Sequence, residues 1–496
     1  MCMHEVIRLN TKNLSLLPKE VVVPVYNRSE IKTGIVHIGI GNFHRAHQAF
    51  YTDQLLQNFD VNDWGICGVA LLETDLKIVE ALRCQDGLYT LMVTEPDGSL
   101  TAMVIGSITE FLFAPENPEA VLEKMANPTI KIITLTITEG GYNFNAATGE
   151  FQITEPAIQW DLSYPDHPKT VFGYLAQALK RRRNKGISGL TLQSCDNIQH
   201  NGDVLKRMLL AYIQVAEPGL TEWIEKQVSF PNSMVDRITP AIKPSDIENL
   251  KTTFGIEDIS PVVCEPYIQW VIEDHYTTGR PLWECVGAHF VSDVAPYERM
   301  KIRLLNGGHS LLGIIGSLSQ YDTIDETVND PLLRIFLREF MDYEVSPILG
   351  EIEGVNLEEY KDSLIQRFGN PNIKDQLSRI CSQSSAKLPK FLIPTIKEQL
   401  EIGGPIQKGT LILAAWCRYL ELAGTSGFDY EVVDEMQMVL KERAIASTGG
   451  DPLAFLKINA VFGDLVHSKH FVDTYLALIE SIRKYGVIQV IGLLNN

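Results

Sequence analysis

Residues 34–43 read Gly-Ile-Val-His-Ile-Gly-Ile-Gly-Asn-Phe, an apolar run that passes directly into a glycine-rich turn. A helical pattern follows over about residues 43–57. A strand, a turn and a helix in this order form the context of a dinucleotide-binding loop, because glycines permit a tight turn and a close approach of pyrophosphate to the helix N-terminus. His44 occupies the third position of the GxGxxG pattern, so the motif is incomplete. The residues expected to bind the cofactor here are Gly39, Gly41, Asn42, Phe43 and, by pairing with a phosphate, Arg45.

The chain shows two regimes of apolar patterning. Up to about residue 293, short apolar runs alternate with helical patterns, and strands are predicted at 34–38, 64–71, 130–138, 190–194 and 287–291, with a hairpin at 89–93 and 102–108. Beyond about residue 296, helical periodicity recurs at 297–319, 331–344, 386–402, 407–422 and 470–484. We therefore predict an α/β fold, with a doubly wound parallel-sheet domain over residues 1–293 and a mostly α-helical domain over residues 294–496.

Composition narrows the class of protein and of partner. The 496 residues include 43 Lys and Arg against 62 Asp and Glu, and this net charge of -19 argues against nucleic acid or an anionic membrane as a partner. The N-terminus lacks the pattern of a signal peptide, and no apolar run approaches 18 residues, so a cytoplasmic protein is expected. The eight cysteines are scattered without a CxxC pair, and His44 and His47 have no further ligand at a recognisable spacing. No metal site is therefore expected.

The second predicted strand ends in Leu71-Leu72-Glu73-Thr74-Asp75, which offers carboxylates where the adenosine ribose of a dinucleotide is expected. An acid at this position favours NAD over NADP because it repels a 2′-phosphate. The separation from the glycines exceeds the usual ~20 residues, so either Glu73 or Asp75 could take the role. The alternative is that both are charges of a solvated loop.

Residues 301–309 read Lys-Ile-Arg-Leu-Leu-Asn-Gly-Gly-His and place an amine, an amide and an imidazole on one short segment. On a uniform helix with a step of about 100°, Lys301 and His309 lie about 80° apart and Asn306 about 60° beyond His309, so all three could face one cleft. The apolar neighbours would lower the pKa of the Lys301 amine toward neutrality, which suits a general base.

An ordinary amphipathic helix is the alternative for this segment, with Lys301 and Arg303 extending to water. Gly307 and Gly308 weaken that alternative, because each costs a helix about 1 kcal/mol relative to Ala. Their presence is easier to explain if a ligand or another backbone must come close there.

Polar residues also follow two other apolar segments. Asn197 lies just after the predicted strand 190–194, where open parallel sheets place active sites, and its amide could donate to an oxygen that acquires negative charge. A turn or helix-capping role is the alternative for this asparagine. Asp236 stands beside Arg237, an arrangement that in most proteins indicates a structural ion pair.

Taken together, these motifs carry a family resemblance. His37-Ile-Gly-Ile-Gly-Asn-Phe-His-Arg-Ala-His-Gln48, Ser194-Cys-Asp-Asn-Ile-Gln-His-Asn-Gly202, Met234-Val-Asp-Arg237 and the segment from Lys301 to His309 resemble, in order over nearly the whole chain, the polyol-specific long-chain dehydrogenases. The resemblance implies a Rossmann-type domain followed by a mostly α-helical domain. It also implies a zinc-independent, NAD-linked interconversion of mannitol and fructose by hydride transfer at C2.

The resemblance further implies roles for individual residues. The lysine matching Lys301 is the general base of that family, the asparagines matching Asn197 and Asn306 polarise the reacting oxygen, and the histidine matching His309 orients the substrate. Asp236, Arg379 and Lys387 are implied around the polyol chain, with Glu298 exchanging protons between the lysine and solvent. The carboxylate matching Asp75 sits at the adenosine end, which favours Asp75 over Glu73.

Within the same family, a fructuronate or tagaturonate reductase is the alternative activity. A uronate carboxylate needs a cationic clamp, which Arg379 and Lys387 could form, whereas a hydroxymethyl group needs only hydrogen bonds. In either case the expected partner is a small polyol or ketose substrate, and the expected assembly is a monomer or a small homo-oligomer.

Overall fold

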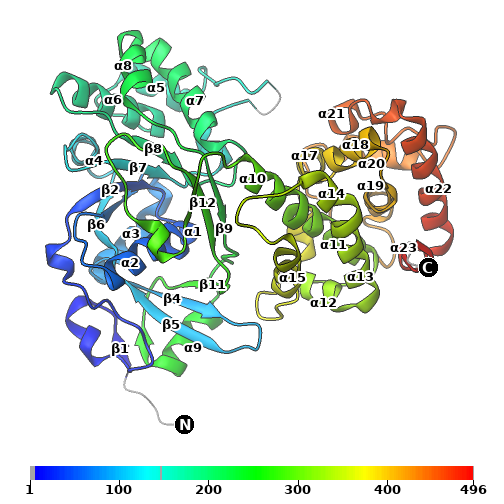
Figure 1. Cartoon of the computed structure of the whole chain (residues 1–496), viewed down its shortest axis with the longest axis horizontal. Helices are drawn as coiled ribbons and strands as arrows, with labels where there is room; N and C mark the ends of the chain where they lie inside the picture. Colours follow the sequence, from blue (N-terminus) through cyan, green and yellow to red (C-terminus); the bar gives the residue numbers. More distant parts are fainter. Residues whose placement is uncertain (1–5, 146–147, 495–496) are drawn as a thin grey trace. The chain divides into compact units, whose positions relative to one another are not determined.

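The computed structural model describes residues 6–145 and 148–494. The chain divides into two compact units (Figure 1). Unit 1 comprises the chain up to Ala295 except for residues 96–98, and unit 2 comprises those three residues and the chain from Pro296 onward. The predicted boundary between residues 293 and 294 lies close to this division.

Unit 1 is built around a five-stranded parallel sheet. Its strands are β2 (Thr33–Ile38), β3 (Gly65–Ala70), β6 (Ile108–Phe113), β7 (Ile132–Leu135) and β8 (Thr191–Ser194). Their spatial order is β6-β3-β2-β7-β8, which is the doubly wound order 3-2-1-4-5 of a Rossmann-type domain. Every residue of β2, β3, β7 and β8 is buried, which explains why these strands form nearly continuous apolar runs in the sequence.

Helices cover both faces of this sheet. They are α1 (Asn42–Ala46), α2 (Gln48–Asn58), α3 (Leu76–Cys84), α4 (Pro118–Met125), α5 (Pro156–Ser163), α6 (Val171–Asn184), α7 (Asn201–Ala216) and α8 (Thr221–Gln227). Helix α9 (Pro244–Phe254) belongs to a separate core, where Leu250 and Phe254 pack with residues such as Met92 and Val104. Side chains of β2 alternate between two cores, because successive residues of a strand point to opposite faces. Val36 and Ile38 pack with residues of α4, α6 and α7, whereas Ile35 packs with residues of α2 and α3.

Three smaller sheets complete unit 1. The predicted hairpin forms as β4 (Tyr89–Thr94) and β5 (Leu100–Ile105), and β11 (Val262–Cys264) pairs with β4. The predicted strand at 287–291 forms as β13 (His289–Val291), but it pairs with β12 (Gln269–Glu273) outside the main sheet, and β12 in turn pairs with β9 (Ser233–Asp236). The third sheet joins β1 (Ile7–Arg8) to β10 (Ile256–Glu257). The prediction that the strand at 287–291 belongs to the large parallel sheet was therefore wrong, because it pairs with β12 instead.

Within the described part of unit 2, the regular elements are helices. They are α10 (Ala295–Lys301), the π-helix η7 (Ile302–Asn306), α11 (Gly307–Leu318), α12 (Ile324–Asn329), α13 (Pro331–Glu339), the π-helix η8 (Phe340–Val345), α14 (Ser346–Leu349), α15 (Leu357–Phe368), α16 (Leu377–Cys381), α17 (Ser384–Phe391), α18 (Ile393–Ile402), α19 (Gln407–Leu422), α20 (Gln437–Ala446), α21 (Asn459–Phe462), α22 (Lys469–Tyr485) and α23 (Val487–Leu494). Helix α11 is buried nearly all round and packs against α16 and α19, so it forms the centre of this unit.

Three long helices expected from the sequence are interrupted. The segments 297–319 and 331–344 each contain a π turn, η7 and η8. The segment 386–402 divides at Leu392 into α17 and α18, where Pro394 in the first turn of α18 cannot donate the hydrogen bond that a continuous helix requires. No helix among residues 6–145 and 148–494 is long and apolar enough to cross a lipid bilayer.

Candidate active site

The glycine loop after β2 has the geometry of a phosphate cradle. Gly39 has a φ of 100°, and a Cβ atom there would lie 2.1 Å from the carbonyl oxygen of Thr136, so only glycine fits. Gly41 caps the N-terminus of α1, and no atom lies within 4 Å of the position of its missing Cβ. The backbone at this helix start is therefore open to close approach by a ligand, as a pyrophosphate group requires.

The third motif position is occupied by a stacked histidine. The ring of His44 lies on that of His37 in β2, with centroids 3.4 Å apart and planes 9° from parallel. Helix α1 ends only five residues after it begins, at His47 with φ -118° and ψ -91°, and α2 starts at Gln48. The side chain at the third motif position is therefore packed on the strand that precedes the glycine loop. Burial lowers the pKa of His37 to about 3 and that of His44 well below its usual range, so both rings are neutral near pH 7.

Arg45 is buried and bonded within the protein. Its Nη1 donates to the carbonyl oxygen of Ser260 at 2.6 Å, and its Nη2 donates to Oδ1 of Asn42 at 2.7 Å. The guanidinium also lies over the ring of Tyr89, 5.2 Å from the centroid. These contacts give Arg45 a role in joining α1 to the segment at Ser260. The predicted pairing of Arg45 with a phosphate stays a prediction, and these contacts compete with it.

The two acidic residues after β3 lie in one short turn. Glu73 and Asp75 are the ends of a 3₁₀ helix, η3 (Glu73–Asp75), which begins three residues after the strand. Oδ2 of Asp75 accepts the N–H of Leu72 at 3.2 Å, while the side chain of Glu73 is exposed. Both carboxylates thus follow the second strand of the doubly wound order, at the position expected for a ribose contact.

The turn after β8 contains a buried carboxylate beside an exposed amide. Asp196 is 8% exposed, and its oxygens accept the N–H groups of Ile137 and Thr138, at 3.0 and 2.8 Å, and the hydroxyl of Tyr142 at 2.8 Å. Asn197 follows it and is exposed. The cap of α7 is His200, not Asn197, so the helix-capping alternative for Asn197 was wrong. The importance of Asp196 was missed in the sequence, although it stands within the motif from Ser194 to Gly202.

Asp236 is the buried last residue of β9 and pairs across the sheet with Gln269. Its neighbour Arg237 points to α1, where its Nη1 donates to the carbonyl oxygen of Ala46 at 2.6 Å. Arg237 also donates through Nε to the carbonyl oxygen of Glu265 at 3.1 Å. Arg237 therefore has a structural role between β9 and the end of α1.

In unit 2, the segment with Lys301, Asn306 and His309 contains the π-helix η7. The N–H of Gly307 donates to the carbonyl oxygen of Ile302, five residues earlier. A π turn takes up one residue more than an α turn, so residues beyond η7 are set back by about 100° relative to a uniform helix. His309, which lies beyond η7, is then about 20° from Lys301 around the helix axis instead of about 80°. The expected uniform helix was wrong here, and the π turn brings His309 closer to the face of the helix that carries Lys301.

The two glycines after the π turn have different surroundings. A Cβ on Gly308 would lie 3.2 Å from Leu337, 3.3 Å from Met341 and 3.4 Å from Phe368, whereas the nearest atom to a Cβ on Gly307 would be 3.5 Å away. Gly308 is therefore packed more closely on its neighbours than Gly307. The ring of His309 lies 4.5 Å from that of Phe368, which is the last residue of α15.

The amphipathic alternative for this segment was wrong. Lys301 is 6% exposed, and Glu298 on the preceding turn of α10 is also buried. Arg303 is buried as well and donates to Oγ1 of Thr395 at 3.1 Å and to Oε1 of Glu398 at 3.0 Å. The cations of this segment therefore lie within the protein instead of extending to water.

Arg379 and Lys387 lie on α16 and α17. The exposed side chain of Arg379 donates through Nε to Oδ1 of Asp375 at 2.7 Å, and this bond raises the pKa of the guanidinium. Nζ of Lys387 donates to the carbonyl oxygen of Ile380 at 3.1 Å, and burial lowers the pKa of the Lys387 amine. Both cations thus belong to one neighbourhood of unit 2, around α16.

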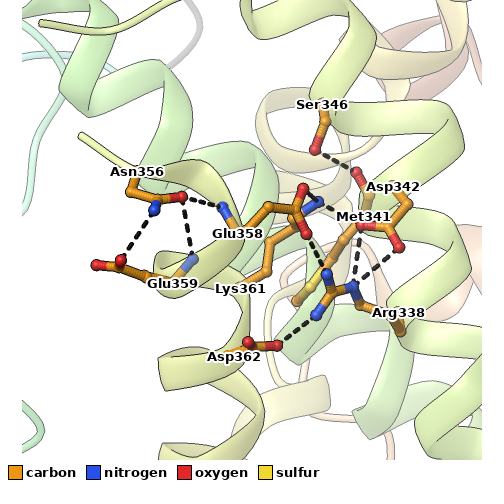
Figure 2. Close-up of polar contacts among 9 residues, drawn as sticks. All are labelled: Arg338, Met341, Asp342, Ser346, Asn356, Glu358, Glu359, Lys361 and Asp362. Atoms are coloured by element: carbon orange, nitrogen blue, oxygen red, sulfur yellow. Dashed lines mark hydrogen bonds and ion pairs between the residues drawn. The ribbon is translucent and has the colours of Figure 1, made fainter.

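A charged cluster that the sequence did not indicate supports α15 (Figure 2). Lys361, 1% exposed at its side chain, donates to Glu358 at 2.6 Å and also to Asp342 of η8. Arg338 of α13 pairs with Asp342 at 2.9 Å and also with Glu358 and Asp362 of α15. This cluster joins α15, which carries the ring beside His309, to η8.

Among residues 6–145 and 148–494, no group of three or more His, Cys, Asp or Glu side chains is arranged to hold a metal ion. Of the two histidines whose spacing could suit a metal, His44 is stacked on His37, and Nε2 of His47 contacts the carbonyl oxygen of Gln269 at 3.0 Å.

Comparison with known proteins gives consistent matches over both units. The sequence matches the mannitol dehydrogenase Rossmann domain over residues 33–285 and the mannitol dehydrogenase C-terminal domain over residues 293–483. Mannitol 2-dehydrogenase of Aspergillus terreus is 44% identical over 494 residues, which cover 97% of this chain and 98% of that protein.

Two solved structures are also similar. Mannitol 2-dehydrogenase of Pseudomonas fluorescens, in a ternary complex with NAD and D-mannitol, is 42% identical with a TM-score of 0.86, and the match covers 98% of this chain and 99% of that one. A D-sorbitol dehydrogenase in substrate-free form is 37% identical with a TM-score of 0.91, covering 98% of this chain and 100% of that one. Because these matches extend over nearly the whole length of both partners, the chain belongs to the mannitol dehydrogenase family.

Proposed function

We propose that the protein is an NAD-dependent polyol dehydrogenase that interconverts D-mannitol and D-fructose by hydride transfer at C2, without zinc. The observation that carries the proposal is the 42% identity, over 98% of this chain, with an enzyme solved together with NAD and D-mannitol. Three features of the structure also support it. The sheet order and the glycine loop suit a dinucleotide, and the π turn lies in the segment that carries Lys301, Asn306 and His309.

NAD is the cofactor in this proposal. The open backbone at Gly41 and the α1 N-terminus suit the pyrophosphate, with Asn42 and Phe43 in the first turn of that helix. Asp75, or Glu73 in the same turn, suits the ribose hydroxyls and repels a 2′-phosphate. When bound, NAD supplies the acceptor for the hydride that leaves C2.

Lys301 is the general base in this proposal. As C2 is oxidised its hydroxyl must lose a proton, and a neutral lysine in a water-poor surrounding can accept it. Glu298 stands three residues before Lys301 on α10, which is a spacing of neighbours on a helix, so it suits proton exchange between the lysine and solvent. In the reverse direction the protonated Lys301 returns the proton to the oxygen of the ketose.

Amides and polar side chains complete the proposed chemistry. The side-chain N–H groups of Asn197 and Asn306 donate to the oxygen as it gains negative charge, which lowers the energy of the transition state. His309, held beside the ring of Phe368, orients the substrate. Asp236, Arg379 and Lys387 contribute hydrogen bonds to the remaining hydroxyl groups.

A second candidate substrate is D-sorbitol. The observation in its favour is the TM-score of 0.91 with a D-sorbitol dehydrogenase, against 0.86 with the mannitol enzyme. The sequence identities, 42% for the mannitol enzyme and 37% for the sorbitol enzyme, favour mannitol. The two polyols differ only in the configuration at C2, which is the reacting carbon of this proposal, so the orientation of that carbon in the site decides between them.

The test is a panel of NAD-linked oxidations of mannitol, sorbitol and arabinitol and of reductions of fructose, fructuronate and tagaturonate, each with and without a chelator. We expect the highest kcat/KM for mannitol and fructose and no loss with chelator. A tenfold preference for a uronate would move the protein to the alternative activity, and loss of turnover on chelation would contradict the zinc-independent mechanism. The cytoplasmic location and the monomeric or small homo-oligomeric state stay predictions from the sequence.

A further inference from the structure

A buried carboxylate in unit 1 joins the loops that follow two neighbouring strands. Asp196 lies two residues after β8, and its two oxygens accept the N–H groups of Ile137 and Thr138 in the loop after β7. The Tyr142 hydroxyl donates to the same carboxylate and lies 2.5 Å from Oγ of Ser194, the last residue of β8. The carboxyl ends of β7 and β8 are therefore held together by one side chain.

The loop that Asp196 holds has an unusual backbone. Thr138 has φ 61° and ψ 169°, a region that essentially only glycine adopts, and a β-branched residue there is strained. Such a conformation persists only where its surroundings specify it. The bonds to Asp196 hold the N–H groups of Ile137 and Thr138, and the carbonyl oxygen of Thr138 accepts the N–H of Gly141 at 3.2 Å, so Asp196 fixes the side of Thr138 that leads in from β7.

The same loop is part of the cofactor side of the sheet. Strand β7 pairs with β2, and the pair forms the switch point of the doubly wound order, where ligands bind outside the carboxyl ends of the strands. Thr136 contacts the glycine loop directly, since its Oγ1 donates to the carbonyl oxygen of Gly39 at 2.8 Å. Residues 136–138 thus lie next to the site proposed for the dinucleotide, and their conformation affects the form of that site.

Asp196 also stands next to a residue of the proposed chemistry. The following residue, Asn197, is the proposed donor to the reacting oxygen, and the carbonyl oxygen of Asp196 accepts Nδ2 of Asn201 at 3.0 Å. Both the side chain and the backbone of Asp196 are therefore held, which sets the direction in which the chain leaves β8 toward Asn197.

We propose that Asp196 is a positioning residue, which keeps the loop at Thr138 in the conformation that receives the nicotinamide dinucleotide and orients Asn197 from the same turn. This inference rests on the proposed function for the identity of the ligand. Asp196 acts through the backbone of Ile137 and Thr138 and through its peptide bond to Asn197, without itself touching the substrate.

The first test is Asp196→Asn, which keeps the size of the side chain but replaces one acceptor oxygen by an amide donor. One of the two loop N–H groups then faces a donor, and the loop loses its conformation. We expect the Kd for NADH, measured by fluorescence titration without turnover, to rise at least tenfold. We also expect kcat with mannitol to fall at least tenfold.

The chain offers a matched control in Asp161→Asn. Asp161 is another buried carboxylate of unit 1, and it accepts the N–H groups of Lys169 and Thr170, at 2.6 and 3.0 Å, and the hydroxyl of Thr170. It holds the start of α6 instead of the loops after β7 and β8. We expect Asp161→Asn to lower the unfolding temperature by a similar amount and to leave the Kd for NADH within twofold of wild type.

A rescue experiment separates positioning from general stability. Glycine adopts the backbone angles of Thr138 without strain, so Thr138→Gly should reduce the dependence on Asp196. We expect the double variant Asp196→Asn/Thr138→Gly to bind NADH at least threefold more tightly than Asp196→Asn. If Asp196→Asn does not fold, Tyr142→Phe removes one of the three bonds and should raise the Kd for NADH by a smaller factor.

The possible failures are distinguishable. A wild-type protein that does not bind NADH would overturn the proposed function, whatever the variants do. A wild type that binds NADH, together with an unchanged Kd in Asp196→Asn, would overturn the positioning role alone. Equal losses of NADH affinity in Asp196→Asn and Asp161→Asn, with no gain from Thr138→Gly, would reduce Asp196 to a general stabilising residue.

Discussion

The rings of His37 and His44 lie parallel, 3.4 Å apart, where strand β2 is followed by helix α1. His44 stands where a dinucleotide-binding motif usually has its third glycine, whose absence of a side chain lets the helix approach the strand. In this protein the ring of His44 stacks on that of His37 at this position. Helix α1 is only five residues long, and the chain bends at His47 before α2 begins. The incomplete motif is thus compatible with the glycine loop at Gly39 and Gly41.

The buried histidines should make stability depend on pH. Their pKa values are lowered in the folded protein, so between the folded value and the ordinary value of ~6.5 the unfolded chain binds more protons, and stability falls as pH falls. From pH 7 to pH 5 His37, whose pKa is about 3 in the folded protein, should lower the free energy of unfolding by about 2 kcal/mol. We expect the free energy of unfolding of His44→Ala, measured with urea, to fall less between pH 7 and pH 5 than that of wild type. The control is His275→Ala, which removes an exposed imidazole instead of a buried one.

Lys301→Ala should remove the proposed base. Turnover should fall by ~10² to 10⁴, and small amines such as methylamine should restore part of it by accepting the proton. The Kd for NADH should stay nearly unchanged, because the glycine loop belongs to unit 1. The measurement is steady-state turnover with and without methylamine. The control is Lys397→Ala, which removes a lysine that forms a surface ion pair with Asp464. Turnover within a fewfold of wild type would rule out Lys301 as the base.

A strong preference for NAD over NADP is expected from the acidic turn after β3. Asp75→Asn should weaken NAD binding and relieve the repulsion of a 2′-phosphate, so the ratio of kcat/KM for the two cofactors should fall. Glu73→Gln is the matched variant in the same turn and should change the ratio less. Equal use of both cofactors by the wild type would show that neither carboxylate contacts the ribose.

Gly307 and Gly308 should differ in their response to alanine. Alanine stabilises a helix by roughly 0.5–1 kcal/mol relative to glycine. Gly307→Ala should show most of this gain, because a Cβ there meets only ordinary contacts. Gly308→Ala should lose it, because its Cβ presses on Leu337, Met341 and Phe368. Thermal unfolding of the two variants measures the difference, and an equal gain in both would contradict the close packing at Gly308.

Phe368→Leu should test the support of His309 by the adjacent ring. Loss of the ring contact at 4.5 Å leaves the imidazole less constrained, so KM for mannitol should rise severalfold with little change in the Kd for NADH. Phe336→Leu, a buried aromatic position on α13, controls for the loss of core volume in the same unit. A KM that changes equally in both variants would show that the ring at residue 368 has no specific effect on substrate binding.

Local patterns in the sequence were sufficient for four strands of the main sheet and for several of the longer helices of unit 2. The strands β2, β3, β7 and β8 were predicted because residues buried on both faces of a sheet form continuous apolar runs. Strands β9 and β12 were not predicted. They are short and contain polar residues, and they form through pairing with strands distant in the chain: β9 pairs with β12, and β12 also pairs with β13.

The sequence by itself determined the class of fold, the family and the identity of the candidate residues, because these depend on periodic burial and on motifs that are local in the chain. Only the tertiary structure decided how those residues are held. The stack of His37 on His44, the π turn between Lys301 and Asn306, and the hydrogen bonds from Ile137 and Thr138 to Asp196 are such features. Each of these features depends on which residues lie within a few ångströms of one another in the folded chain. Local sequence patterns do not specify such contacts, because the partners are distant in sequence or their helix contains one extra residue per turn.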